Sequence, residues 1–428
     1  MPPSARKGAP KDLELHPTVY LVATSHLDTQ WRWTVERTIR DFLPPTVEGN
    51  LELFERFPSY VLSFEGAFRY MLVQEYYPEL WRQLVDACAS GRWQPAGSML
   101  DSPDVNIPAP ESLIRHVLYG NSFFARELGR PTRDLFLPDC FGFGFALPSI
   151  AAHCGILGFS SQKFIKWMPP AEIPFDLGYW KGPDGRGLVA VLNPDGYGDP
   201  IRENLTASPR LERRIERLRR TSGLRTTYMY FGTGDQGGPL DTGSMYRLED
   251  ALAGRGEGPI RICHGASDQL FELLTPEQKG SLPVYTGELL LPRHGTGSLT
   301  SIAFLKRANR KNEQRAIAAE SAATIASLFG AFPYPHEQLR SAWIRFLWHQ
   351  QHDGITGTSI PRANRIAAND HAVAANLFAD ARDSAAVAVA RGLPSTPQGV
   401  ATLLVFNPLG LARQDVATVS ITFDAPPP

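Results

Sequence analysis

The sequence has 428 residues, of which 43% are hydrophobic and 20% charged, and its formal net charge is −1 at pH 7. This composition is typical of a soluble globular protein of two or three domains. A near-neutral charge excludes the strong basic field that favours nucleic acid or an anionic membrane surface. No apolar run approaches the roughly 20 residues that a membrane helix needs, and residues 1–10 lack the apolar core of a signal peptide. We therefore expect a cytoplasmic protein with no membrane partner.

The first 300 residues alternate short apolar runs with helix-like segments. The apolar runs predict strands at residues 18–23, 135–137, 187–192 and 228–231. Residues 111–128 and 211–220 have the pattern of helices between them. Strands that alternate with helices indicate an α/β fold, and we expect residues 1–300 to form a distorted parallel β/α barrel.

The pattern changes after residue 300. Three consecutive helices are predicted at residues 302–329, 336–351 and 362–391, which indicates a three-helix bundle domain over residues 301–392. A Pro/Ser-rich link at residues 393–398 precedes two predicted strands at residues 401–406 and 416–423. Two strands are too few for an independent domain. We therefore expect residues 393–428 to be a linker and the beginning of a β-sandwich domain that is truncated in this chain.

Polar residues follow the strand predicted at residues 18–23. His26 and Asp28 are two positions apart, so in extended chain both side chains point to one side. An imidazole and a carboxylate aimed at one point suit Zn²⁺, although a structural His–Asp hydrogen bond is the alternative. Trp31 follows closely, and its flat ring suits the apolar face of a sugar, although most tryptophans are core residues.

Asp139 occupies an equivalent place after the strand predicted at residues 135–137. Gly142 and Gly144 let the backbone turn away, which would leave the carboxylate exposed at the carboxyl end of the sheet. In β/α barrels this end carries the active site. The alternative is an aspartate that only forms a turn.

Residues 349–358 gather polar side chains at the end of the helix predicted at residues 336–351. His349, His352 and Asp353 lie just before a turn rich in glycine and threonine. The helix preceding them is apolar, and polar groups this dense at a buried helix end need partners. A metal ion together with a hydroxylated ligand would supply those partners.

A glycine-rich loop at residues 231–239 follows the strand predicted at residues 228–231. The loop lacks the Gly-Lys-Ser/Thr ending of a nucleotide-binding P-loop. Close approach of the backbone to a neutral polar ligand is at least as well supported as phosphate binding, and a flexible turn is the remaining alternative. Asp235 in this loop is a candidate catalytic acid.

These segments together resemble glycoside hydrolase family 38, the α-mannosidases. The matching stretches fall in the family's order and cover about residues 18–410 of the chain. They are residues 26–31, 104–108 with 111–115, 138–142, 287–289 with 294–295 and 300–301, and 352–358. The chain departs from the family by having Gln351 where a second histidine often precedes the His-Asp pair.

The resemblance implies a catalytic barrel, a helical domain and later β-domains. It also implies four zinc ligands, namely His26, Asp28, Asp139 and His352. Asp139 would also be the attacking nucleophile. Three residues would contact the sugar: Trp31, Phe141 and Asp353. The general acid is less uniform within the family, so Asp235 stays a hypothesis from the loop alone.

The sequence thus predicts a zinc-dependent retaining α-mannosidase that removes terminal mannose from an oligosaccharide or glycan. A retaining enzyme uses two carboxyl groups, here Asp139 and Asp235. Nucleic-acid partners are not expected, and a homo-oligomer is compatible with the composition. Two alternatives stay open. One is a zinc-dependent carbohydrate deacetylase, which would use zinc-bound water, and the other is a carbohydrate-binding protein without turnover.

Overall fold

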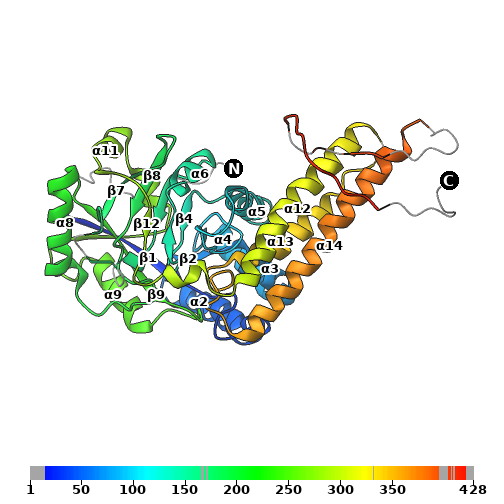
Figure 1. The fold of residues 1–428 in the computed structure, drawn as a ribbon. Helices are drawn as coiled ribbons and strands as arrows, with labels where there is room; N and C mark the ends of the chain where they lie inside the picture. Colours follow the sequence, from blue (N-terminus) through cyan, green and yellow to red (C-terminus); the bar gives the residue numbers. More distant parts are fainter. Residues whose placement is uncertain are drawn as a thin grey trace, which may run out of the picture.

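The computed structural model describes residues 15–164, 168–169, 172–330, 332–394, 403–405, 407 and 410–420. It consists of an α/β part and three long helices that extend from one side of that part (Figure 1). No helix among the described residues is long and apolar enough to cross a membrane.

The first sheet contains five parallel strands. Its main path runs β10–β1–β2–β3, and β9 also pairs with β1. The bounds are β1 (Thr18–Ser25), β2 (Leu62–Glu65), β3 (Trp93–Ala96), β9 (Thr226–Thr233) and β10 (Arg261–His264). Every residue of β1 is buried, as expected for a continuous apolar run inside a parallel sheet. Because all strands of this sheet run in one direction, their carboxyl ends meet at one edge.

The second sheet also contains five strands, in the order β11–β7–β8–β6–β4. Its bounds are β4 (Asp134–Phe136), β6 (Gly158–Ser160), β7 (Leu177–Lys181), β8 (Gly187–Val191) and β11 (Val284–Thr286). The strands are parallel except for the antiparallel β7–β8 pair. A small antiparallel pair, β5 (Gly142–Phe143) with β12 (Leu289–Leu290), lies apart.

The α/β class and the mostly parallel strands of the prediction are confirmed, but a continuous ring of strands is not found among the described residues. The two sheets meet at β3 and β4 without a backbone ladder between them. Instead, the backbone NH of Gly97 donates to the Asp134 side chain, with 3.1 Å between nitrogen and Oδ1. A buried carboxyl group thus stands where a barrel would have strand pairing.

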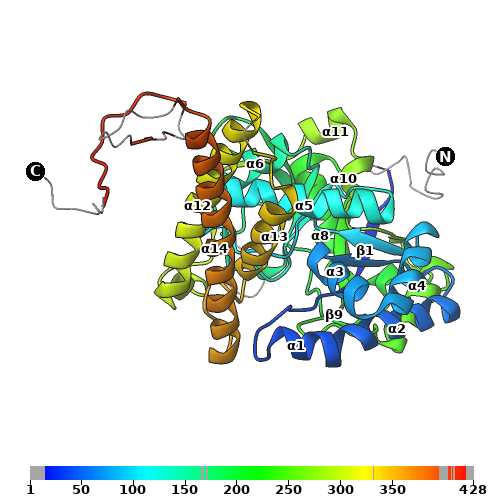
Figure 2. The ribbon, with the colours of Figure 1, turned by 90° about the vertical axis from the view of Figure 1, so that its right-hand side faces the viewer.

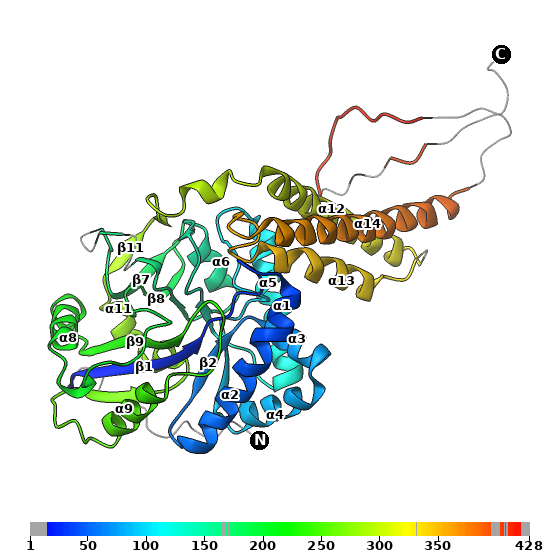
Figure 3. The same ribbon diagram turned by 90° about the horizontal axis from the view of Figure 1, so that it is seen from below.

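Helices surround both sheets in the three views (Figures 1, 2 and 3). Those of the α/β part are α1 (Val35–Arg37), α2 (Leu43–Arg56), α3 (Ala67–Tyr76), α4 (Pro78–Ala89), α5 (Pro110–Leu128), α6 (Leu147–His153), α8 (Pro209–Ser222), α9 (Thr242–Leu252), α10 (Gln269–Leu273) and α11 (Pro276–Gly280). The helices predicted at residues 111–128 and 211–220 are α5 and α8. A π-helical turn at Thr38–Phe42 and 3₁₀ turns at Leu205–Ala207 and Thr296–Leu299 complete this part.

Three long helices pack together beside the α/β part, as Figure 2 shows. They are α12 (Ala303–Leu328), α13 (His336–Leu347) and α14 (Pro361–Arg391). Trp343, Phe346 and Phe378 form their shared core with small alanines. Arg115 of α5 makes a two-pronged ion pair with Glu320 of α12, at nitrogen–oxygen distances of 2.9 and 2.6 Å, and ties the two parts together.

The chain after residue 301 differs from the prediction in two ways. α13 ends at Leu347 and continues as a 3₁₀ turn, η4 (Trp348–Gln350), instead of running to residue 351. The following segment turns into the α/β part, where the backbone NH of His352 donates to the Ser102 oxygen at 3.0 Å. The second difference concerns the strands predicted at residues 401–406 and 416–423. Their described residues, 403–405 and 416–420, form no strand and are exposed.

A strand needs a hydrogen-bonded partner, and no neighbouring strand is present beside residues 403–405 and 416–420 within the described part of the chain. The remainder of the two predicted strands lies outside the described residues, as does most of the predicted link at 393–398. The domain limits at residues 300 and 392 and the truncated β-domain stay predictions.

Candidate metal centre

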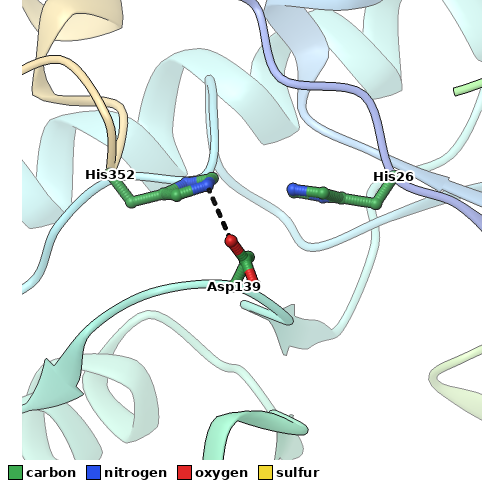
Figure 4. Close-up of side chains that lie close together, drawn as sticks. All are labelled: His26, Asp139 and His352. Carbon is green, nitrogen blue, oxygen red and sulfur yellow. Dashed lines mark ion pairs between the residues drawn. The ribbon is translucent and has the colours of Figure 1, made fainter. Parts of the chain in front are cut away.

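Four side chains that are far apart in sequence meet at the carboxyl edge of the sheets. His26 and Asp28 follow β1, Asp139 follows β4, and His352 follows η4. Ligand atoms of His26, Asp139 and His352 all lie within 4.8 Å of one another. Figure 4 shows the two imidazole rings on either side of the Asp139 carboxyl group. The predicted convergence of β1, β4 and the helical part on one point is therefore present.

Asp28 lies between the two histidines. Its Oδ1 atom is 3.1 Å from Nε2 of His26 and 3.1 Å from Nε2 of His352. Asp139 approaches from the other side, with its Oδ2 atom 3.8 Å from Nε2 of His352. Although His352 is fully buried, its Nε2 atom makes no hydrogen bond with any described residue. Since buried polar atoms are nearly always paired, this nitrogen indicates a ligand.

Both imidazoles are oriented by acceptors on their far side. Nδ1 of His26 is 2.5 Å from Oε1 of Glu65, the last residue of β2. Nδ1 of His352 is 2.9 Å from the backbone oxygen of Ser102. A carboxylate or carbonyl oxygen accepts, so both Nδ1 atoms donate and both Nε2 atoms face the centre. Such outer contacts typically fix the tautomer of a metal-binding histidine.

The charges of the centre stabilise one another. Burial disfavours the imidazolium of His26, yet the carboxylates of Glu65 and Asp28 outweigh burial and raise the pKa of His26 from 6.5 to about 10. Burial alone would raise the pKa of Asp28, but the two imidazoles hold it below its usual value. Burial likewise opposes a charge on His352, whose pKa is nonetheless raised by Asp28. A metal cation would compete with the protons on these ring nitrogens.

The donor set fits a divalent zinc ion. Two imidazole nitrogens and two carboxylate groups are ligands that Zn²⁺ accepts, and neither calcium nor magnesium favours imidazole. The Nε2 atom of His352 faces the carboxyl groups of Asp28, Asp139 and Asp353 without a hydrogen bond, which supports the same interpretation. The residues present therefore fit the implied metal.

Asp353 lies within reach of the same centre. Its Oδ2 atom is 3.6 Å from Nε2 of His352, and a second possible ligand group comprises Asp28, His352 and Asp353. The hydroxyl of Thr358 donates to its Oδ1 atom. Burial and the nearby Asp28 raise the pKa of Asp353 from 3.8 to about 7. Gln351, the departure from the family pattern, donates to Oδ1 of Asp28 at 3.4 Å.

Asp139 has a cationic neighbour that the sequence did not indicate. The ammonium group of Lys163 forms an ion pair with Oδ1 of Asp139, and Lys163 is only 7% exposed. The same ammonium lies 5.0 Å from the centre of the Phe141 ring. The ring of Phe141 also stands edge-on to that of His352 at 5.9 Å, so Phe141 lies beside the centre, and its contact with a sugar stays a prediction.

Asp235 approaches the centre through Tyr197. The backbone NH of Asp28 donates to the backbone oxygen of Asp235 at 2.8 Å, which places the glycine-rich loop beside the loop that follows β1. The Tyr197 hydroxyl donates to Oδ1 of Asp235 at 2.9 Å, and the Tyr197 ring lies 4.8 Å from the ring of His26. Burial, followed by the carboxylates of Asp139, Asp235 and Asp28, raises the pKa of Tyr197. Tyr197 therefore connects Asp235 with the metal-binding group.

Trp31 is half-buried on the loop after β1. The guanidinium of Arg32 lies 4.2 Å from the centre of its ring, and the ring of Trp33 stands edge-on at 6.0 Å. The backbone oxygen of Trp31 accepts from Ile360 at 2.9 Å, so the loop is held against the segment that carries His352. None of these three contacts places the Trp31 ring on the metal-binding group itself.

The main functional residues missed in the sequence are Glu65, Lys163 and Tyr197. Glu65 could have been found, because it follows a mostly apolar run at residues 60–64 just as His26 follows the run at residues 18–23. Lys163 and Tyr197 lie in segments without a motif, and only the fold brings them to Asp139 and Asp235.

The fold is shared with a solved alpha-mannosidase. The crystal structure of an alpha-mannosidase from Enterococcus faecalis V583 superposes with a TM-score of 0.73 at 22% sequence identity. The alignment covers 88% of this chain and 43% of that one. At this level of identity the likeness establishes the fold alone.

Sequence profiles give the family. The glycosyl hydrolases family 38 N-terminal domain matches residues 16–288, and the alpha mannosidase middle domain matches residues 294–388. The chain belongs to glycosyl hydrolase family 38, and the resemblance seen in its motifs is confirmed.

Two curated relatives are alpha-mannosidases by name. Alpha-mannosidase 2C1 of Homo sapiens is 29% identical over 403 residues, and that of Mus musculus is 30% identical over 410 residues. Each alignment covers 93% of this chain and 37% of the relative. The chain therefore spans little more than a third of the length of these curated relatives.

Proposed function

We propose that the chain carries the catalytic site of an exo-acting, zinc-assisted retaining α-mannosidase. The observation that carries the proposal is the cluster of buried His26, Asp28 and His352 with partly exposed Asp139, in which a ring nitrogen of His352 makes no hydrogen bond with a described residue. Membership of glycosyl hydrolase family 38 and the names of the curated relatives support the same activity.

His26, Asp28, Asp139 and His352 would hold the zinc ion, with Asp353 beside them. When bound, zinc would supply a Lewis acid that holds and polarises hydroxyl groups of the terminal mannose. The buried position of the centre, in which Asp353 is only 3% exposed, suits a chain end rather than the middle of a glycan. Phe141 and Trp31 would pack on the apolar face of the sugar, and the Asp353 carboxylate would accept hydrogen bonds from its hydroxyls.

In the first step, a carboxylate oxygen of Asp139 attacks the anomeric carbon while the bond from that carbon to the glycosidic oxygen breaks. Asp235 transfers its proton to the departing oxygen, so the aglycone leaves as an alcohol. The mannosyl group is then linked to Asp139 as an ester. Lys163 pairs with the free Asp139 carboxylate and would hold it ready for attack.

In the second step, Asp235 takes a proton from water, and the water oxygen attacks the anomeric carbon. The ester bond to Asp139 breaks, and mannose leaves with the configuration it had in the substrate. The assignment of Asp235 is supported by Tyr197, which contacts both Asp235 and the ring of His26. Tyr197 would keep the Asp235 carboxyl group facing the sugar-binding site.

The proposal is tested with an aryl α-mannoside and proton NMR of the product. We expect release of the aryl alcohol, α-mannose as the first product, and loss of turnover when zinc is removed by a chelator. A first product with the β configuration would refute the retaining mechanism. Release of acetate from an acetylated sugar would favour the deacetylase, and binding without turnover would favour a carbohydrate-binding protein.

Three variants assign the roles. Asp139→Ala should lose nearly all turnover and keep its fold, whereas the control Asp250→Ala should keep full activity, because Asp250 pairs with Arg255 at the surface. Asp235→Ala should impair hydrolysis of a natural mannoside far more than that of a substrate with a good leaving group, which needs no proton. Equal losses on both substrates would remove Asp235 as the acid.

A further inference from the structure

Arg69 is a buried charge close to the candidate metal centre. It lies in the first turn of α3, and its side chain is 0% exposed. Burying a guanidinium costs free energy unless acidic and carbonyl partners surround it. The partners of Arg69 therefore indicate why the chain keeps a charge in its interior.

The guanidinium of Arg69 joins the loop that carries His26 and Asp28 to Glu65 at the end of β2. Its Nε atom donates to the backbone oxygen of Leu27 at 2.5 Å, and Leu27 lies between His26 and Asp28. Its Nη1 atom is 3.3 Å from the backbone oxygen of Glu65, and its Nη2 atom is 3.8 Å from the Glu65 carboxylate. That carboxylate in turn holds Nδ1 of His26 at 2.5 Å.

Asp101 extends the same network to His352. Its Oδ1 atom accepts from Nη1 of Arg69 at 2.9 Å and from the backbone NH of Ser102 at 2.6 Å. Its Oδ2 atom accepts from the hydroxyl of Thr29 at 3.0 Å, on the loop after β1. The backbone oxygen of Ser102 is the acceptor that orients Nδ1 of His352. All of these groups are buried.

Gly66 makes room for the guanidinium. A Cβ atom at position 66 would lie 2.1 Å from Nη1 of Arg69, and the residue has a φ of +82°, a conformation that favours glycine. The backbone beside Arg69 is thus shaped to admit its head group. This close fit is independent of the hydrogen-bond pattern and points to the same residue.

We propose that Arg69, paired with Asp101, is the positioning residue of the metal centre. It joins the loop after β1, the end of β2 and the segment at residues 101–104, and so brings His26, Asp28 and His352 to one point. The inference rests on the proposed zinc function and adds a residue that touches neither metal nor sugar. A point charge such as lysine could not make these contacts from one planar group.

The test measures zinc affinity of the full chain by competition with a chromophoric chelator, using Zn²⁺ alone. Contacts that orient metal ligands typically contribute about 10–100-fold in affinity, and we expect a loss of that size for Arg69→Met. The matched control is Arg92→Met. Arg92 donates to three backbone oxygens, those of Tyr60, Phe54 and Phe57, and none of these contacts reaches the centre. This control should retain the zinc affinity of the parent chain.

A second variant keeps the inference testable if Arg69→Met does not fold. Asp101→Asn keeps the shape of the side chain but removes its charge, so it should fold and still weaken zinc binding. The d–d absorption spectrum of the Co²⁺-loaded protein should also change in Asp101→Asn and stay unchanged in Arg92→Met. If Arg69→Met does not fold, Asp101→Asn alone decides the question.

The outcomes separate this inference from the proposed function. Parental zinc affinity in folded Arg69→Met or in Asp101→Asn overturns the role of Arg69 and leaves the mannosidase proposal intact. An equal loss in Arg92→Met also overturns it, because the effect would then be one of general stability. Failure of the parent chain to bind zinc refutes the metal part of the proposed function itself.

Discussion

The junction between the two sheets predicts an unusual pH dependence of stability. Asp134, at the start of β4, is fully buried and accepts from the Gly97 backbone. Burial, and then the nearby carboxylate of Asp268, raises the pKa of Asp134 from 3.8 to about 7. Between these values the folded chain holds a proton that the unfolded chain has released. Stability therefore falls as the pH rises through this window and levels off above pH 7.

The variant Asp134→Asn removes this loss because an amide does not ionise. Two pH units separate pH 5 from the raised pKa of about 7, and each unit corresponds to about 1.4 kcal/mol. The stability of the variant relative to the parent chain should thus rise by about 3 kcal/mol between pH 5 and pH 8. Urea unfolding of both chains at the two pH values measures this difference.

The control is Asp241→Asn, since Asp241 has a lowered pKa caused first by its hydrogen bond with Ser244 and caps α9. The stability of Asp241→Asn relative to the parent chain should not rise with pH. A relative stability of Asp134→Asn that is the same at pH 5 and pH 8 would refute the reasoning about the junction.

Three further variants probe the site and the packing. Lys163→Met removes the cation beside Asp139. Since a hydrogen bond to a charged group is worth about 1.5–3 kcal/mol, kcat on an aryl α-mannoside should fall by about 10–100-fold, and an unchanged kcat would contradict the assignment. Gly120→Ala puts a Cβ atom 2.4 Å from the Met99 backbone and should lower stability by about 1–3 kcal/mol, whereas Gly280→Ala, in open space, should not. Phe378→Ala empties the core of the three helices and should cost about 3–5 kcal/mol in thermal or urea unfolding.

Local sequence patterns predicted the parts of the site that follow apolar strands. The run predicted at residues 18–23 lies in β1. His26 and Asp28, which follow β1, point to one centre because side chains alternate in extended chain. The same reasoning placed Asp139 after β4. The buried helix end singled out His349, His352 and Asp353 because such polar groups require partners, and the family resemblance then selected His352 as the ligand.

The residues that orient these ligands were not predictable in the same way. Arg69 stands in a helix whose pattern gives no reason to bury a charge, and its partners Leu27 and Asp101 are 42 and 32 positions away. Such contacts depend on how separate strands and loops pack, which no local pattern records. For the same reason the sequence did not show that the described strands form two separate sheets, between which Gly97 donates to the Asp134 side chain.

The strands expected near the chain's end illustrate a third limit. Residues 403–405 and 416–420 have strand-like composition, but strand formation depends on a partner, and none lies beside them among the described residues. Helices are less dependent on distant partners because their hydrogen bonds are local. This difference explains why α12 and α14 match their predicted ranges within a few residues.

The central claim is that one zinc ion joins the segments carrying His26, Asp28, Asp139 and His352. Anomalous diffraction at the zinc absorption edge, from crystals of the zinc-loaded chain, tests this claim most directly. We expect a strong peak about 2.0–2.2 Å from both Nε2 atoms and from an oxygen of each carboxyl group. A zinc-loaded crystal with no peak between these four side chains, or with zinc held only elsewhere, would refute the proposed zinc site.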